Sequence, residues 1–303
     1  MKILITGGTG FVGAQLIRRL VAQDCECVVL TRNTAKARRK LGTMGCQFIS
    51  WDTRSPIPKE AFEGVDGAVN LVGESLASRR WSAEQKKRIF DSRIEPTRHL
   101  VEGLNEHAPQ CKVLVSASAI GYYPVNLPDR LTEDSEPGDG FLPDICRQWE
   151  EEATHLNPRS RVVILRFGVV LGRDGGVIGK LLPVFKMGLG GPVSDGSQMM
   201  SWIHLEDVIG VTLRALIDDA MFGVYNAVAP EPVTNRAFSK SLGHALGRPA
   251  VLTAPAFMLR TAMGEMSTVV LDSQTISGDK LLEAGYEFLY PDIDQAMHEI
   301  ASG

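Results

Sequence analysis

The first 167 residues alternate between two kinds of hydrophobic pattern. Short runs of β-branched and other apolar residues predict buried strands, and longer stretches with apolar residues three or four positions apart predict amphipathic helices. This rhythm is typical of a parallel sheet covered by helices on both faces, and right-handed crossovers make such a sheet doubly wound. The predicted strands are residues 2–6, 26–31, 47–50, 67–71, 112–117 and 161–167, and the predicted helices are residues 12–23, 34–42, 82–107 and 143–156.

The pattern changes after residue 167. Residues 168–200 are rich in glycine and methionine and predict an irregular loop that opens a smaller lobe. Strand and helix signals return at 201–218, and the last stretch, interrupted by Pro255 and Pro291, predicts short helices. We therefore expect three parts. A cofactor-binding domain spans 1–167, and 201–230 returns to it. A substrate-binding lobe spans 168–248, with a strand at 224–228 and a helix at 235–246, and a helical appendix spans 249–303.

Composition and charge narrow the class of protein. With 32 Lys+Arg against 36 Asp+Glu, the formal net charge is -4, so a nucleic-acid partner and an anionic membrane are disfavoured. No apolar run approaches the roughly 18–20 residues of a membrane span, and the chain enters a strand at Ile3 rather than a signal peptide. Five scattered cysteines without CxxC spacing, and histidines that form no ligand set, predict reduced thiols and no metal. We expect a cytoplasmic protein.

The strongest motif is the glycine-rich run TGGTGFVG at 6–13, directly after a predicted strand and directly before a predicted helix. In such a motif Gly7 allows the tight turn, Gly10 lets a diphosphate approach the backbone, and Gly13 lets the helix pack close to the strand. The N-terminus of the helix offers free amides and a partial positive charge. The run predicts dinucleotide binding, and the residues expected at the cofactor are Gly7, Thr9, Gly10, Phe11, Val12 and Gly13.

The end of the second strand indicates which dinucleotide binds. An NAD enzyme usually offers Asp or Glu there to the ribose 2′-hydroxyl, whereas this chain reads Thr31 and Arg32. Arg32 can pair with a 2′-phosphate, so we expect NADP(H); a solvated arginine is the alternative. Arg38 and Arg39 either add positive field or face solvent. Asp52, after the third strand, either accepts the adenine amino group or forms a turn.

Further runs carry a family resemblance. Together with the glycine-rich run, NLVG, SASAIGYYP, LRFGVVLG and SWIHLEDV resemble the extended short-chain dehydrogenase/reductase superfamily. RRWSAEQKKRIFDSR, GKLLPVFKMGLGGPVSDG and KLLEAGYEF resemble more closely its atypical epimerase-like branch, the NAD(P)-dependent or nucleotide-sugar epimerase family with a C-terminal domain of unknown function. The resemblance spans nearly the whole chain. It implies an α/β fold, with a doubly wound parallel Rossmann sheet and a smaller C-terminal α/β substrate lobe, and it is much less specific for the reaction.

The resemblance also assigns residues. It implies that Ser118 is the active-site serine, with Ser116 as the weaker candidate. Arg93 occupies the place of a structural asparagine in many relatives, so it either offers a cation to the substrate or lies on the helix surface. The residues implied at the cofactor after the fourth, fifth and sixth strands are Leu71, Val72, Gly73, Ser116 and Phe167.

One departure from the family bears on catalysis. Relatives of the reductase type carry Tyr-x-x-x-Lys on the helix after the fifth strand, where this chain has Leu142 and Cys146, and neither can perform the proton transfer. Tyr122 is the substitute we expect as proton donor, and Tyr123 lies beside it; packing in the core or over the nicotinamide is the alternative for both. Lys180 lies in the segment that relatives use for substrate and either holds a phosphate or faces solvent.

These features predict an NADP(H)-dependent oxidoreductase or epimerase that acts on a carbonyl or carbinol of a sugar nucleotide or related small molecule. Ser118 would hydrogen-bond the reacting oxygen and Tyr122 would donate the proton. The resemblance suggests that His204, at the start of a predicted helix, has a structural role together with Asp207. The alternative is a regulator or sensor that binds NADPH without turnover, and for either function we expect a monomer or a homodimer.

Overall fold

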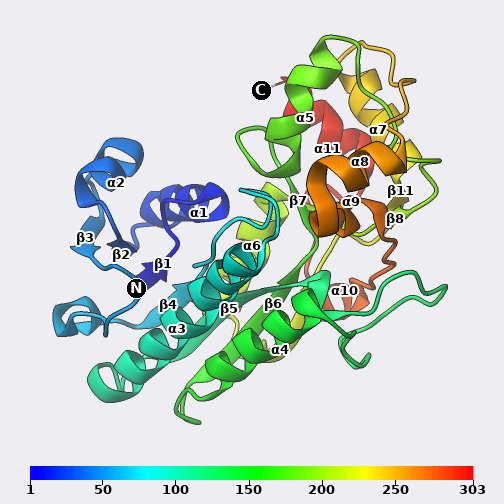
Figure 1. Ribbon diagram of the computed structural model, residues 1–303. Helices are drawn as coiled ribbons and strands as arrows, with labels where there is room; N and C mark the ends of the chain where they lie inside the picture. The colour runs from blue at the N-terminus through cyan, green and yellow to red at the C-terminus, as the bar shows by residue number, and fades with distance from the viewer. Residues whose placement is uncertain (303) are drawn as a thin grey trace.

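A seven-stranded parallel sheet forms the centre of the protein (Figure 1), whose computed structural model describes residues 1–302. Every hydrogen-bonded pair of neighbouring strands in this sheet is parallel, which confirms the predicted doubly wound architecture. The strands, in their order across the sheet, are β10 (Gly223–Ala227), β6 (Arg161–Phe167), β5 (Val113–Ala119), β4 (Gly67–Asn70), β1 (Lys2–Thr6), β2 (Glu26–Thr31) and β3 (Cys46–Ser50).

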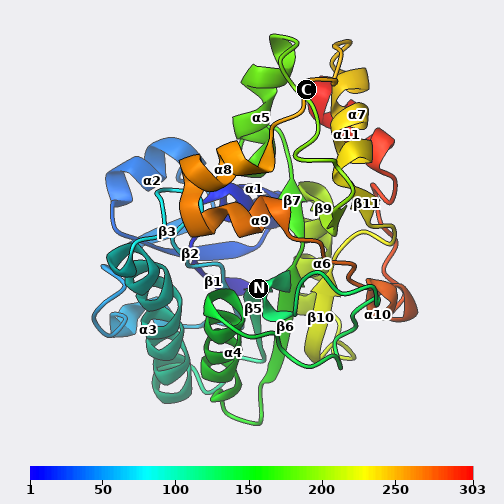
Figure 2. The ribbon, with the colours of Figure 1, turned by 45° about the vertical axis from the view of Figure 1, so that its right-hand side comes forward.

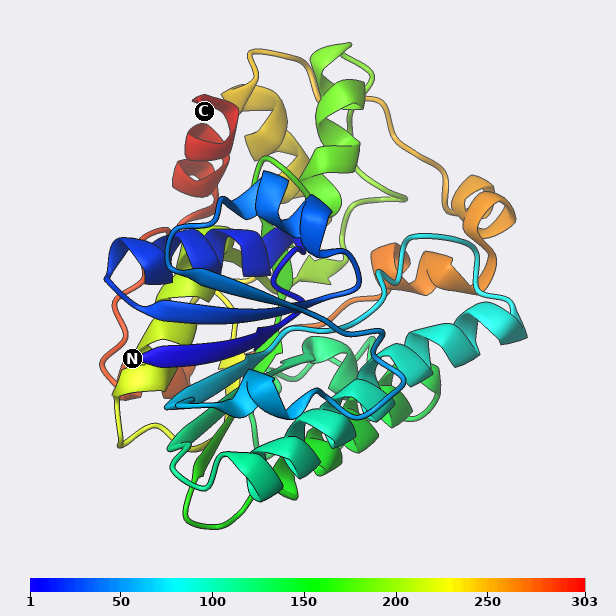
Figure 3. The same cartoon turned by 90° about the vertical axis from the view of Figure 1, so that its left-hand side faces the viewer.

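Helices cover both faces of the sheet (Figure 3). Ile3 and Ile5 of β1 pack in one apolar cluster with α1 and α6, whereas Leu4, between them, packs in a second cluster with α3. This alternation follows from the two-residue period of a strand, which here is apolar on both faces. The helices of the sheet domain are α1 (Phe11–Ala22), α2 (Thr34–Leu41), α3 (Ala83–His107), α4 (Phe141–Thr154) and α6 (Leu205–Ile217).

The strand order reverses between β1 and β4. The chain runs outward from β1 through β2 to β3, then returns to the other side of β1 and continues through β4, β5 and β6. In open sheets of this kind, ligands bind outside the carboxyl ends of the strands at such a reversal. The residues that follow β1, β2, β4, β5 and β6 are therefore the ones placed to form a site.

The segment 168–200 contains regular structure, so the expectation of an irregular loop was wrong. It folds into β7 (Val169–Leu171), α5 (Gly176–Lys186) and β8 (Met199–Met200). Glycine and proline lower the intrinsic helix propensity of α5, and Pro183 lies inside it. Packing outweighs this cost, because Ile178 and Phe185 are fully buried in the apolar cluster of the second lobe.

The second lobe is the part of the chain in which β7, α5, β9, α7 and α11 pack around one apolar cluster (Figure 2). Its two short sheets pair β7 with β9 in parallel and β8 with β11 in antiparallel fashion. No helix of residues 1–302 is long and apolar enough to cross a membrane. The remaining elements are β9 (Trp202–His204), β11 (Val233–Thr234), α7 (Asn235–Ala245), α8 (Ala256–Met263), the 3-10 turn η3 (Gly264–Ser267), α9 (Thr268–Leu271), α10 (Asp279–Glu283) and α11 (Ile293–Ser302), besides the 3-10 turns η1 (Lys59–Phe62) and η2 (Ile120–Tyr122) of the sheet domain.

The last 50 or so residues are helical as expected, but they also return to the sheet domain. Gln274 donates from Nε2 to the carbonyl oxygens of Ile120 (3.2 Å) and Tyr123 (3.0 Å), in the turn after β5. The side chain of Asn226, in β10, donates to the carbonyl of Ser277 at 3.1 Å. The division into three parts stays a prediction, since these bonds tie the final segment into the first.

Asp207 is the strongest of these ties. The carboxylate is fully buried at the start of α6, and it accepts hydrogen bonds from the backbone N–H groups of Leu289 (2.7 Å) and Tyr290 (3.0 Å) and from the hydroxyl of Tyr286 (3.1 Å). His204 caps the same helix, because its Nδ1 accepts from the backbone N–H of Glu206. Both residues thus have the structural role expected from the sequence.

We predict that Asp207→Ala lowers the free energy of unfolding by about 2–4 kcal/mol, because two buried backbone N–H groups and a hydroxyl lose their acceptor. Urea denaturation of both proteins measures the loss. Asp219→Ala is the matched control, since that side chain is 93% exposed and should change stability by less than about 1 kcal/mol. Equal losses in the two variants would contradict the role of Asp207.

Candidate functional site

A bend that has no room for side chains follows β1. Gly7 has a φ of +66°, and a Cβ on it would lie 2.3 Å from the carbonyl oxygen of Leu71, after β4. A Cβ on Gly13 would lie 2.5 Å from the carbonyl oxygen of Gly7, which also accepts the N–H of Gly10 at 2.9 Å. Only glycine fits at Gly7 and Gly13, so the bend brings β1, β4 and α1 into backbone contact.

The N-terminus of α1 opens directly onto this bend. Its N-cap, Gly10, offers no side-chain hydrogen bond, and the first turn carries no acidic residue. The N–H groups of Phe11, Val12 and Gly13 consequently have no partner within the helix, and Ala14 is the first residue to bond back, to Gly10. Free amides and the positive end of the helix dipole fit an anionic diphosphate, so the local geometry suits the dinucleotide expected from the sequence.

Positive side chains gather beside the bend. Arg32 follows β2, is exposed, and makes no ion pair with the described residues. Arg38, on α2, lies with its guanidinium 5.7 Å from the ring centre of Phe48. Lys40 donates from Nζ to the carbonyl of Thr9 at 2.9 Å, a contact that sequence reasoning missed although Lys40 lies on the helix that follows Arg32. No carboxylate stands directly after β2, so the arrangement favours an additional phosphate over a free ribose hydroxyl.

Asp52 forms a turn. One of its oxygens, Oδ1, accepts from the backbone N–H groups of Arg54 (2.9 Å) and Ser55 (3.1 Å) and from the hydroxyl of Ser55. These hydrogen bonds hold the pKa of Asp52 below its ordinary value. Of the two roles considered for Asp52, the structure shows the turn, and the contact with adenine stays a prediction.

Asn70 joins the strand ends beneath the crevice. Its Oδ1 accepts from the hydroxyl of Thr6 at 2.7 Å, and its Nδ2 donates to Thr97 on α3 at 2.8 Å and to Ser116 at 3.2 Å. All four side chains are buried. Ser116, expected at the cofactor, therefore contributes its hydroxyl to this interior network, and Asn70 is a positioning residue that the sequence did not single out.

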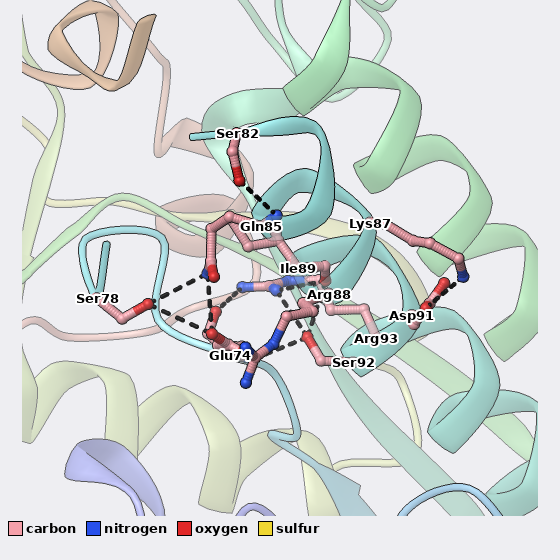
Figure 4. A network of polar contacts seen from close by, with 10 residues as sticks. All are labelled: Glu74, Ser78, Ser82, Gln85, Lys87, Arg88, Ile89, Asp91, Ser92 and Arg93. Atoms are coloured by element: carbon pink, nitrogen blue, oxygen red, sulfur yellow. Dashed lines mark hydrogen bonds and ion pairs between the residues drawn. The ribbon is translucent and has the colours of Figure 1, made fainter. Parts of the chain in front are cut away.

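Arg93 holds the loop that follows β4 (Figure 4). It donates from Nη2 to the carbonyl of Glu74 and from Nη1 to the carbonyl of Ile89, both at 3.0 Å. Burial lowers the pKa of Arg93. The carboxylate of Glu74 in turn accepts from Gln85 Nε2 at 2.8 Å. Arg93 is thus neither a free surface cation nor one wholly open to substrate, because Nη2 holds the loop at Glu74 while Nη1 bonds to its own helix at Ile89.

The same loop and the first turn of α3 that follows it contact α5 and η3. Lys180 of α5 donates from Nζ to the carbonyl of Ala77 at 2.8 Å. Lys86, in the first turn of α3, pairs with Glu265 of η3 at 2.5 Å. We refer to residues 74–82 as the bridging loop. Lys180, expected to hold a substrate phosphate, is engaged with this loop instead.

A buried ion pair lies next to the expected active-site serine. Ser118 is 2% exposed and donates from Oγ to Glu150 Oε1 at 2.5 Å. Arg166 of β6 grips the same carboxylate with both Nε and Nη2, each at 2.8 Å. The guanidinium of Arg166 thus binds both oxygens of the Glu150 carboxylate, a bidentate and charge-assisted pair. The proton of the Ser118 hydroxyl is therefore directed at Glu150, and the lone pairs of Oγ remain as acceptors.

The two tyrosines after β5 have different environments. Tyr123 is 1% exposed; its hydroxyl donates to Asn226 and accepts from Arg166, both at 2.7 Å. Burial raises the pKa of Tyr123 to about 12. Tyr122 is half-buried, and the Arg166 guanidinium carbon lies 3.4 Å from the centre of its ring. Tyr122 thus remains the more accessible of the two, whereas Tyr123 belongs to the interior.

The helix α4 turns Leu142 and Cys146 toward the end of β5. A Cβ on Gly121 would lie 3.4 Å from the Cβ of Leu142 and 3.9 Å from the sulfur of Cys146. Burial raises the pKa of the Cys146 thiol to about 12, so this group stays protonated near neutral pH and does not replace a lysine ammonium. Among residues 1–302, no three His, Cys, Asp or Glu side chains gather to bind a metal ion either.

The crevice therefore brings together most of the residues expected from the sequence. The bend after β1, Arg32 after β2, Leu71, Val72 and Gly73 after β4, and Phe167 at the end of β6 all lie at the carboxyl edge of the sheet. Leu71 and Phe167 each pack against the small apolar cluster of Ile94, Ala117 and Trp149. The hydroxyls of Ser116, Ser118 and Tyr123 point instead into buried networks.

Comparison with protein families agrees with this geometry. The sequence profile described as the NAD dependent epimerase/dehydratase family matches residues 3–227. A second profile, described as Domain of unknown function (DUF1731), matches residues 254–300.

Named relatives match over the full chain. The Epimerase family protein SDR39U1 of Homo sapiens is 33% identical over 306 residues, covering 100% of both chains, and the chloroplastic SDR39U1 homolog of Arabidopsis thaliana is 37% identical, covering 99% of this chain and 86% of its own. The crystal structure of human SDR39U1 with NADPH is 34% identical with a TM-score of 0.90, covering 100% of this chain and 99% of that one. The UDP-glucose 4-epimerase of Thermus thermophilus, solved with NAD, shares the fold (22% identity, TM-score 0.78, 100% and 98% covered).

We predict that Glu150→Gln lowers the free energy of unfolding by about 3–5 kcal/mol, because it leaves the buried Arg166 without its counter-charge. Urea denaturation measures the change. Glu152→Gln, on the same helix, breaks the ion pair with Arg98, whose side chain is half exposed, and should cost no more than about 1 kcal/mol. If Glu150→Gln cost as little as this control, Glu150 would not be compensating Arg166.

Proposed function

We propose that this chain, which belongs to the NAD dependent epimerase/dehydratase family, binds NADP(H) and acts as an oxidoreductase or epimerase on a carbonyl or carbinol carbon of a sugar nucleotide or a related small molecule. The observation that carries the proposal is the set of unpartnered amides at the start of α1, beneath a bend without side chains. Arg32, with no acid after β2, supports NADP(H), and so does the NADPH in the structure of human SDR39U1.

Different residues would bind different parts of the dinucleotide. The N–H groups of Phe11, Val12 and Gly13 would bind the diphosphate. Arg32 would pair with the 2′-phosphate, with Arg38 contributing positive field. The nicotinamide, when bound, supplies a hydride acceptor or donor.

At the reacting carbon, Ser118 and Tyr122 carry the proposed chemistry. While Ser118 donates its proton to Glu150, the lone pairs of its oxygen would accept a hydrogen bond from a substrate hydroxyl. Tyr122 would exchange the proton, since its ring is fixed on Arg166 and its hydroxyl makes no hydrogen bond to residues 1–302. An epimerase would return the hydride to the opposite face of a keto intermediate, and a reductase would release the oxidised cofactor.

A second function is favoured by one observation. Leu142 and Cys146 stand where reductases of this type hold a tyrosine and a lysine, and the Cys146 thiol stays protonated. A chain that lacks this pair could bind NADPH and signal its presence without turnover. NADPH fluorescence titration, followed by absorbance assays on panels of carbonyl compounds and nucleotide sugars, separates the two: saturable binding without turnover supports the regulator.

We predict that Arg32→Ala weakens NADPH binding about ten- to a hundredfold and leaves NADH binding nearly unchanged, because NADPH alone carries the additional phosphate. Fluorescence titration of both dinucleotides gives the two dissociation constants. Arg18→Ala removes an exposed positive charge elsewhere on α1 and is the control. Equal losses for NADPH and NADH in Arg32→Ala would reject the phosphate contact.

We also predict that Tyr122→Phe reduces turnover about a hundred- to ten-thousandfold while NADPH still binds, because the substitution removes only the proposed proton donor. Tyr290→Phe, in the second lobe beside His204, removes a phenol hydroxyl outside the crevice and should retain full turnover. A Tyr122→Phe protein as active as the native one would exclude Tyr122 as the donor.

A further inference from the structure

A second cavity lies in the other lobe, on the outer side of α7. Arg236, Lys240 and His244 follow one another at four-residue spacing, so they share one face of the helix. Arg248, just beyond the helix, continues the positive wall, and Val251 belongs to the opposite one. The cavity measures about 480 Å³, and no carboxylate lines it.

The backbone holds the opposite wall in place. The N–H of Ala254 donates to the carbonyl of Pro192 at 3.0 Å, and the side chain of Asn235 accepts the N–H of Val193 at 2.7 Å. A Cβ on Gly191 would lie 2.4 Å from the carbonyl oxygen of Leu252, so the two segments touch through their backbones. The groove is therefore a formed feature of the fold and not a gap between independent loops.

The positive charges of the groove are poorly compensated. Within residues 1–302, the permanently charged side chains of Lys240 and Arg248 make no ion pair, and both are exposed. Arg236 donates to the backbone carbonyl of Asp195. The positive charge of Arg236 also acts on the carboxylate of Asp195 and contributes to lowering its pKa. Like charges four residues apart on a helix repel each other. A stripe of this kind, in a chain with a formal net charge of -4, favours an external anion as its counter-charge.

We propose that this groove binds a small phosphate-bearing ligand. Arginine and lysine are the side chains that recognise phosphate, and the volume lies within the range of about 300–1,000 Å³ typical of small-molecule sites. Pro192, Ala250 and Val251 offer an apolar surface to the carbon part of such a ligand. The groove is separate from the bend after β1, because α7 packs in the core of the second lobe.

Calorimetric titration with inorganic pyrophosphate tests this site. The full chain first receives one equivalent of NADPH, which occupies the bend after β1 and leaves no excess dinucleotide to compete for the groove. We expect saturable binding of one pyrophosphate per chain, weakened about tenfold or more in the double variant Lys240→Gln/Arg248→Gln, which loses two charge-assisted contacts. Circular dichroism melting checks that the variant is folded.

The matched control is Lys59→Gln/Arg159→Gln, which removes the same charge from exposed positions in the sheet domain. This control should bind pyrophosphate as the native chain does. Equal weakening in both double variants would show a net-charge effect and would overturn the proposal, as would the absence of saturable binding to the native chain. A resonance of the His244 imidazole, assigned by its loss in His244→Gln, should shift on titration in the native chain and in the control only.

Discussion

The contact between Gly7, Gly13 and the backbone after β4 is the constraint on which the rest of the site depends. Because a Cβ at either glycine would collide with a carbonyl oxygen, β1, β4 and α1 approach each other more closely than any other residue would allow. That closeness directs the free amides of α1 at the strand reversal. Asn70 holds the neighbouring strand ends in register below them, so the crevice has a rigid floor.

The polar side chains near the end of β5 do not form a tyrosine and lysine pair. Glu150 and Arg166 neutralise each other in the interior, and the serine and one tyrosine after β5 are hydrogen-bonded to this pair. Buried charges of this kind persist only when every donor and acceptor is satisfied. The groups that remain open to a ligand are few, and Tyr122 is the one whose hydroxyl is uncommitted.

Local patterns were enough to predict the sheet, its helices and the glycine bend, since these depend on periodicity and on residues close in sequence. The helix α5 was missed because packing of Ile178 and Phe185, not propensity, stabilises it. Glu150 and Arg166 meet from α4 and β6, and no spacing rule connects them. Lys40 was missed for the same reason, because its reach to the bend depends on how α2 returns over the sheet.

The hydrogen bonds of Gln274 and Asn226 affect the order in which the molecule is completed. The turn after β5 and the edge strand β10 find their last partners in a segment that leaves the ribosome only after residue 270 has been synthesised. Until then, the carbonyl of Tyr123 and the side-chain amide of Asn226 lack the partners that the final segment supplies. The growing chain therefore completes these contacts only when its synthesis is nearly finished.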